Sequence, residues 1–167
     1  GVRLYLDDKL VGEQSVPDSA GLKAVFTIPY APGTLRAAGV DASGSEAEHV
    51  TLATAGTPRA VRLTPDKTIM TADNQDITFI IAEITDRHGN VVPDAAIPLS
   101  CSVSGPASVL ASGSADLTSM EPYSTPSVTT WKGRAIVAVK STRRTGAIRL
   151  TATSPSLPRA TLRLTSR

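Results

Sequence analysis

The stretch DITFIIAEITD, Asp76–Asp86, is the longest candidate β-strand in the chain. Successive side chains of a strand point to opposite faces, so a strand with one buried face alternates apolar and polar residues. The second half of this stretch alternates, whereas its first half is apolar on both faces. The alternation predicts that one set points into a core and the other outward, namely Ile80, Ala82 and Ile84 against Ile81, Glu83 and Thr85.

Runs of the same kind follow this strand and precede it. Upstream is RAVRLTPD, and downstream come VVPDAAIPLSCSVSG, SVLASG, GRAIVAVKS, GAIRLTATS and RATLRLTSR. In GRAIVAVKS we expect Ala135, Val137 and Val139 to face inward. Seven or so strands with turns every 8–12 residues or so are typical of an immunoglobulin-like sandwich.

The N-terminal third is also strand-like, but it is shorter. VRLYL turns at Asp7-Asp8 into KLVGEQSV, which indicates a hairpin, and TLRAAGVDA and HVTLATAG follow later. LKAVFTIPY is expected to be a further strand, with Leu22, Ala24, Phe26 and Ile28 on one face. The strand pattern restarts after Thr57-Pro58. We therefore predict an all-β chain of two consecutive immunoglobulin-like β-sandwich domains: a small one over residues 1–57, truncated at its N-terminus, and a second of about seven strands over residues 58–167.

Composition limits the possible partners. The 167 residues are 41% hydrophobic but 4% aromatic, which indicates cores of Val, Ile, Leu and Ala. A formal charge of +2 is too small to indicate nucleic acid or an anionic membrane as partner. The sequence contains no apolar run of about 18 residues, so we expect no membrane insertion. It also has no signal sequence at Gly1. We expect the chain to be a piece of a longer protein.

Residues with catalytic or metal-binding chemistry are sparse. The sequence contains no GxSxG, HExxH, Walker A or GxGxxG motif. The single cysteine, Cys101, lies in an alternating run and is expected to be a small buried hydrophobe. His49 and His88 have no partner at metal-ligand spacing. Asp73 and Asp76 could offer oxygen atoms to a cation, but they lack the spacing of a calcium loop. We expect no catalytic residue, cofactor or metal.

The long connection Ser114–Gly133 interrupts the run of strands and holds the only tryptophan. Long ordered loops are usually packed by their own side chains. We therefore expect part of the loop's apolar set, named at the end of this paragraph, to cover an end of the core. We also expect Trp131, half-buried at a strand edge, to stabilise the second sandwich. The alternatives are interdomain or intersubunit contact, and sugar binding by Tyr123 and Trp131. The apolar set is Leu117, Met120, Tyr123 and Val128.

Several stretches together resemble the C-terminal region of bacterial family two glycoside hydrolases of the β-galactosidase type. They are RLYLDDKLVGEQSV, FTIPYAPGTLRAAGVDASG and TAGTPRAVRLTPDKTIMTADNQDITFIIAEITDRHGNVVPDA. SADLTSMEPYS and WKGRAIVAVKST are similar to a loop and the following strand of that family. The family commonly has an Asn-Gly turn where this chain has Asp7-Asp8. The resemblance covers nearly the whole chain.

The resemblance implies a noncatalytic accessory fragment of a secreted, cell-surface or periplasmic bacterial enzyme that degrades carbohydrate. The catalytic barrel of such enzymes has no counterpart here, so no catalytic residue is carried over. The implied roles are domain packing, spacing or subunit contact, with the catalytic and other domains of the parent enzyme, and another subunit, as partners. The alternative is a carbohydrate-binding or adhesion module with its own glycan ligand. An autonomous enzyme is a third and weaker interpretation.

Overall fold

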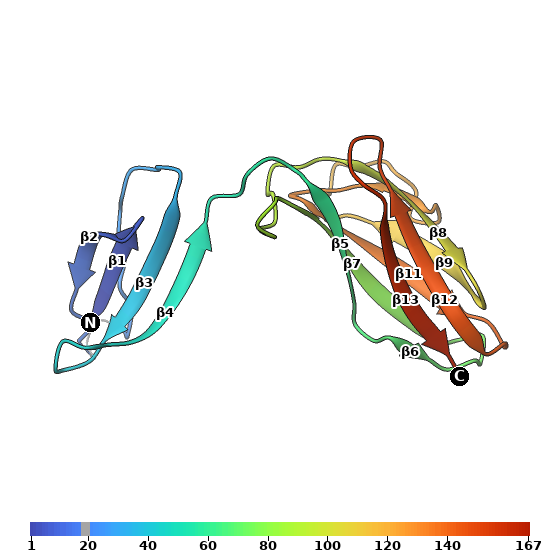
Figure 1. The fold of residues 1–167 in the computed structure, drawn as a ribbon, viewed down its shortest axis with the longest axis horizontal. Coiled ribbons are helices and arrows are strands. Elements are labelled where there is room, and N and C mark those ends of the chain that lie inside the picture. Colours follow the sequence, from blue (N-terminus) through green and yellow to red (C-terminus); the bar gives the residue numbers. More distant parts are fainter. Residues whose placement is uncertain (18–20) are drawn as a thin grey trace. The chain divides into compact units, whose positions relative to one another are not determined.

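The computed structural model describes residues 1–17 and 21–167, and within these ranges every regular element is a β-strand (Figure 1). This confirms the all-β prediction. The chain divides into two compact units, unit 1 over Gly1–Thr54 and unit 2 over Ala55–Arg167.

Unit 1 contains one antiparallel sheet in the order β2-β1-β3-β4. The predicted hairpin is confirmed, because β1 pairs with β2. Asp7 and Asp8 connect the two strands with φ angles of 47° and 63°. Positive φ at both central residues is the requirement of a type I′ turn, whose twist matches that of the flanking strands. The strands are β1 Val2–Leu6, β2 Lys9–Gln14, β3 Thr34–Val40 and β4 Glu46–Ala53.

The strand predicted for LKAVFTIPY does not form, although the segment packs on unit 1 with the predicted alternation. Leu22 is exposed and has a φ of 56°, whereas Ala24, Phe26 and Ile28 are half-buried. The backbone of Val25 is bound by one side chain instead of a strand: the Gln14 amide donates to its carbonyl at 2.7 Å and accepts from its N–H at 3.0 Å. Pro29 near the end of the segment, and Pro32 just beyond it, lack the N–H donors that a ladder requires.

Unit 2 is a sandwich of two sheets. Sheet I has the order β5-β7-β11-β9, and sheet II has the order β10-β8-β12-β13-β6. All neighbours are antiparallel except β13 and β6. The bounds are β5 Ala60–Pro65, β6 Ile69–Met70, β7 Ile77–Thr85, β8 Pro98–Ser104, β9 Ala107–Gly113, β10 Ser127–Thr129, β11 Arg134–Ser141, β12 Gly146–Thr153 and β13 Ala160–Ser166.

The core of unit 2 lies between these two sheets. The predicted inward residues of β7 are all 0% exposed, and those of β11 are buried too, so both alternation predictions are confirmed. Cys101 is buried as predicted, and burial raises the pKa of its thiol to about 11. The remaining core comes mainly from sheet II and includes Leu99, Ile148, Leu150, Ala152 and Leu164.

The connection between β9 and β11 contains β10, which pairs with β8 and buries Val128. The expectation that part of the loop's apolar set covers the core is confirmed for Val128, whereas Leu117 and Met120 are 100% and 93% exposed. Polar contacts hold the loop instead. The Glu121 carboxylate accepts hydrogen bonds from the backbone N–H of Thr129 at 2.9 Å and from its hydroxyl at 2.6 Å.

Candidate functional site

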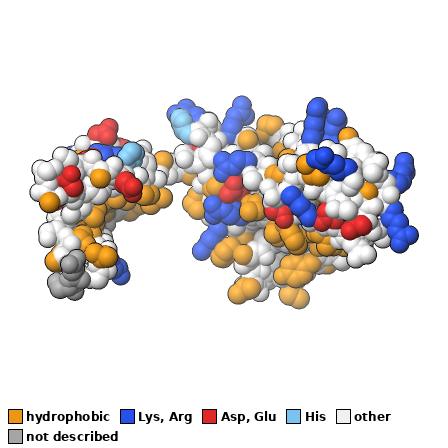
Figure 2. All heavy atoms as spheres, turned by 90° about the horizontal axis from the view of Figure 1, so that it is seen from below, with side chains coloured by type: hydrophobic (Ala, Val, Ile, Leu, Met, Phe, Trp, Pro, Cys, Tyr) orange, Lys and Arg blue, Asp and Glu red, His pale blue; other side chains and the backbone are white. Residues whose placement is uncertain are grey.

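Large apolar side chains lie exposed on the outer surface of sheet I. Phe79 and Ile81 of β7 and Ile136 of β11 are 48%, 46% and 44% exposed. The strand register pairs Ile136 with Ile81, and Ala138 with Phe79, so these side chains are neighbours on the same surface. Hydrophobic atoms gather along the lower edge of the right-hand unit in Figure 2. We call Phe79, Ile81 and Ile136 with their surroundings the apolar face.

The apolar face follows from the local sequence. Outward positions of a strand with one face in solvent are usually polar, as they are in most of sheet II. In DITFIIAEITD the outward positions include Phe79 and Ile81. Exposed apolar residues that occur singly need no explanation, but a contiguous group with a polar rim marks an interaction site.

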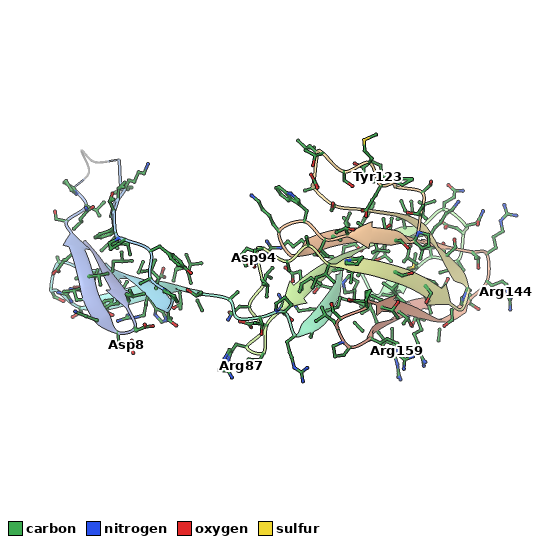
Figure 3. The ribbon with its side chains drawn as sticks, turned by 90° about the horizontal axis from the view of Figure 1, so that it is seen from above. Asp8, Arg87, Asp94, Tyr123, Arg144 and Arg159 are labelled. Carbon is green, nitrogen blue, oxygen red and sulfur yellow. The ribbon has the colours of Figure 1, made fainter. Side chains whose placement is uncertain are left out.

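Tyr123, one of the two predicted contact residues, joins the apolar face. Gly113 of β9 lies directly opposite Ile136, so a side chain at residue 113 would stand beside Ile136. The Tyr123 ring occupies that place, because a Cβ atom on Gly113 would lie 2.7 Å from its Cδ1 atom. The ring remains 66% exposed. Figure 3 shows Tyr123 in the loop over this side of unit 2.

Trp131, the second predicted contact residue, lies at the turn between β10 and β11. It exchanges backbone hydrogen bonds of 2.9 and 3.0 Å with Arg134, which places both side chains on one side of the hairpin. Its side chain is 38% exposed, and the Lys132 ammonium lies 4.5 Å from the centroid of its ring. The structure therefore places Trp131 near one end of the apolar face, with one of its ring faces occupied by a cation.

Three charged side chains form the rim at this end. The Glu83 carboxylate contacts the guanidinium groups of Arg62 at 2.8 Å and Arg134 at 3.1 Å. Partial burial opposes ionisation of Glu83, but the two guanidiniums prevail and hold its pKa below the usual range. An apolar centre with a satisfied polar rim is the usual anatomy of a protein interface.

The other candidate residues serve local structure. The Asp73 carboxylate accepts hydrogen bonds from the N–H groups of Gln75 and Asp76, and the Asp76 carboxylate pairs with Lys67. The backbone N–H of His88 donates to Asp86 within a turn. Residues 1–17 and 21–167 hold no group of three His, Cys, Asp or Glu side chains that could bind a metal. The same residues form no helix that could cross a membrane.

The fold of unit 2 is that of an all-β sandwich of the immunoglobulin-like class. Residues 61–163 match the model of glycoside hydrolase family 2 C-terminal domain 5, and the chain belongs to this family. Residues 1–48 match a domain family of unknown function, DUF4982. These matches confirm the predicted resemblance and identify the matched segment as an accessory domain rather than the catalytic barrel.

Relatives with similar sequences and structures are much longer than this chain. A β-galactosidase of Bacteroides ovatus, BoGH2A, is 30% identical over 99% of this chain, which covers 19% of that protein. A crystal structure of a glycosyl hydrolase family 2 member from Bacteroides cellulosilyticus superposes with a TM-score of 0.93 at 31% identity, covering 99% of this chain and 21% of that one. A β-glycosidase from Bacteroides vulgatus gives a TM-score of 0.88 at 26% identity, with 98% and 21% covered. The chain thus spans about one fifth of the length of these relatives.

Proposed function

We propose that this chain is the noncatalytic C-terminal accessory part of a carbohydrate-degrading family 2 glycoside hydrolase of the β-galactosidase type. Within that enzyme, unit 2 packs its apolar face against another domain of the same polypeptide. The observation that carries this proposal is the contiguous exposed group Phe79, Ile81 and Ile136, bordered by the Glu83 ion pairs. A periplasmic or cell-surface location of the parent enzyme, which the family resemblance implies, is part of the same proposal.

Two arguments favour a domain of the same polypeptide as the occupant. The relatives contain about four fifths of their length outside the matched region, so further domains are available as neighbours. Completing the burial of three half-exposed large apolar side chains is worth about 2–4 kcal/mol. That is modest for two separate proteins but sufficient for domains that are already linked, because the link raises the effective concentration. Lys132 over the Trp131 ring also makes docking a better fit than sugar stacking at this face.

A charge-neutral double substitution tests the proposal in the full-length polypeptide that carries this chain. Ile81→Glu with Ile136→Lys replaces the cross-strand apolar pair by an ion pair, which suits exposed antiparallel strands but not an apolar interface. The matched control is Thr151→Glu with Thr161→Lys, which changes a directly opposed pair on the outer face of sheet II. Both variants are compared with wild type by thermal unfolding and limited proteolysis.

We expect the Ile81/Ile136 variant of the full-length protein to unfold at a lower temperature and to release unit 2 faster on proteolysis. The control should resemble wild type, and both variants of the isolated chain should keep similar melting temperatures. Equal behaviour of the two variants in the full-length protein would overturn the proposal. A second result would also overturn it: the wild-type protein forms an oligomer, and the Ile81/Ile136 variant dissociates that oligomer without changing the rate of proteolysis. That result would assign the apolar face to subunit contact.

A further inference from the structure

The outer surface of sheet II is polar and cationic, in contrast to the apolar face. Beyond Pro98, the outward positions of β8, β12 and β13 carry only Ser, Thr, Ala and Arg, so no carboxylate lies along these described strands. This surface is therefore suited to a negatively charged ligand.

Arg149 of β12 and Arg163 of β13 lie directly opposite each other in the strand register. Side chains in this arrangement leave Cβ atoms about 5 Å apart, and like charges there destabilise the pair of strands. Within the described parts of the chain, neither guanidinium takes part in an ion pair. A bound anion would remove the repulsion and provide both side chains with charge-assisted hydrogen bonds.

A hollow of about 370 Å³ lies beside these two arginines. Ala147, which pairs with Thr165, is the smallest side chain that lines it. Arg149 and Arg163 line it together with the hydroxyl-bearing Ser104 and Thr165. Its volume is within the range of about 300–1,000 Å³ that is usual for small-ligand sites.

We propose that this hollow binds the anionic group of an acidic glycan, either a uronate carboxylate or a sulfate ester. Guanidinium groups form charge-assisted, bidentate hydrogen bonds with the oxygen atoms of such anions. The hydroxyls of Ser104 and Thr165 are suited to hydrogen bonds with the adjoining sugar hydroxyls. A peptide ligand would be anchored by large apolar contacts. The apolar residues that line this hollow, Ile148 and Leu164, are buried under the sheet, so a sugar fits better.

This proposal goes beyond the docking function and uses the opposite sheet, so either can fail without the other. The test measures binding of the full 167-residue chain to polygalacturonate, to dextran sulfate and to neutral galactan, by calorimetry and affinity electrophoresis at low salt. The site variant is Arg149→Gln with Arg163→Gln. The control, Arg87→Gln with Arg159→Gln, removes the same charge in the β7–β8 and β12–β13 connections, at residues that do not line the hollow.

We expect polygalacturonate, dextran sulfate or both to bind, with affinity reduced about tenfold or more in the site variant and less than about twofold in the control. Binding of one polyanion alone identifies carboxylate or sulfate as the recognised group and supports the proposal. Equal loss in both variants would show non-specific charge attraction and overturn it. Equally tight binding of neutral galactan, or no binding at all, would also overturn it.

Discussion

Units 1 and 2 contain similar alternating strands but bury them differently. Unit 2 places two sheets face to face, so its inward side chains reach near-zero exposure across both layers. The described part of unit 1 has a single sheet, and its buried hydrophobic residues are Leu4 and Ala38. A segment without strand structure packs on that sheet, while Val50 and Leu52 of β4 stay 70% and 68% exposed. The comparison shows that a second sheet, more than the strand pattern itself, determines how much apolar surface is buried.

The largest effect should come from a cavity in the core of unit 2. Leu150 of β12 is fully buried between the sheets, so Leu150→Ala removes apolar contacts on all sides and leaves a cavity. We expect unit 2 to lose about 4 kcal/mol of unfolding free energy. Urea unfolding of the chain, followed by a probe in unit 2, measures this loss. A loss below about 1 kcal/mol would contradict the two-sheet core.

The corresponding change in unit 1 should cost less. Leu4 is buried in its sheet, but the irregular covering segment can relax into the space that Leu4→Ala creates. We expect a loss of about 2 kcal/mol in the unfolding of unit 1, the lower end for such a truncation. Hydrogen exchange of β1 and β3 amides reports on unit 1 separately. A cost equal to that of Leu150→Ala would show that the two units pack their cores equally well.

The same contrast explains what the sequence predicts well and what it does not. The alternation of Ile80, Ala82 and Ile84 specifies the strand and its inward face, since burial between two sheets repeats at period two. The alternation around Val25 cannot show that this segment does not form a strand. There the Gln14 amide binds the backbone N–H and carbonyl of Val25, and this contact depends on one side chain from elsewhere in the chain. The sequence does not indicate the short strand β10 either, since a strand of three residues carries too little pattern.

The candidate site was predicted in part. Tyr123 and Trp131 stood out in the sequence as aromatic residues in a long loop. The strand residues Phe79, Ile81 and Ile136 carry the apolar face. The sequence signal for Phe79 is the first half of β7, which is apolar on both faces, whereas Ile81 and Ile136 are isoleucines at the outward positions of alternating strands. The cationic hollow had no local signal, because Arg149 and Arg163 meet only through the pairing of β12 with β13.

Substitution of Trp131 tests whether truncating a half-buried residue at the edge of unit 2 costs as little unfolding free energy as truncation in unit 1. It is 38% exposed, so Trp131→Ala removes only part of the burial that a core aromatic provides. We expect a loss of about 1–2 kcal/mol, less than the 3–5 or so typical of a fully buried aromatic. Thermal unfolding with Trp131→Phe as a control checks this value. A loss as large as that of Leu150→Ala would place Trp131 in the core.

Each unit has a carboxylate that holds a turn, which makes their acid responses comparable. Asp86 in unit 2 accepts hydrogen bonds from the N–H groups of Gly56, His88 and Asn90, and these hold its pKa well below the usual range, the Gly56 bond most strongly. In unit 1 the Ser43 hydroxyl and the N–H groups of Ser45 and Ser43 lower the pKa of Asp41 in the same way.

Because both pKa values are depressed in the folded state, the stabilisation is complete above the unfolded value near 4 and is lost as the pH falls below it. Asp86→Asn should lower the melting temperature at pH 7 and flatten its dependence on pH between about 5 and 2 in unit 2 alone. Asp41→Asn should lower the melting temperature and flatten its pH dependence in unit 1 alone. Melting curves recorded across this pH range check both, and an unchanged slope would contradict the assigned hydrogen bonds.

The smallest expected effect is a gain in stability at the β1–β2 turn. In unit 2, the turn Lys132-Gly133 places glycine at the second position, where φ is 73°. In unit 1 the second position is Asp8, with a φ of 63°. A residue with a Cβ atom in this region costs roughly 1–2 kcal/mol, and glycine avoids that cost but loses more entropy on folding. Asp8→Gly should therefore stabilise unit 1 by about 0.5–1 kcal/mol.

Asp7→Gly is the matched control, because Asp7 occupies the first position of the same turn. Its carboxylate accepts a hydrogen bond from the backbone N–H of Thr34 at 2.7 Å and fills the space in front of Gly33. Glycine there relieves the backbone but leaves the N–H of Thr34 without this acceptor, so we expect no gain or a small loss. Hydrogen exchange in β1 measures both variants. If Asp7→Gly stabilised unit 1 as much as Asp8→Gly, backbone strain alone would determine how this turn affects stability. The hydrogen bond to Thr34 would then contribute nothing.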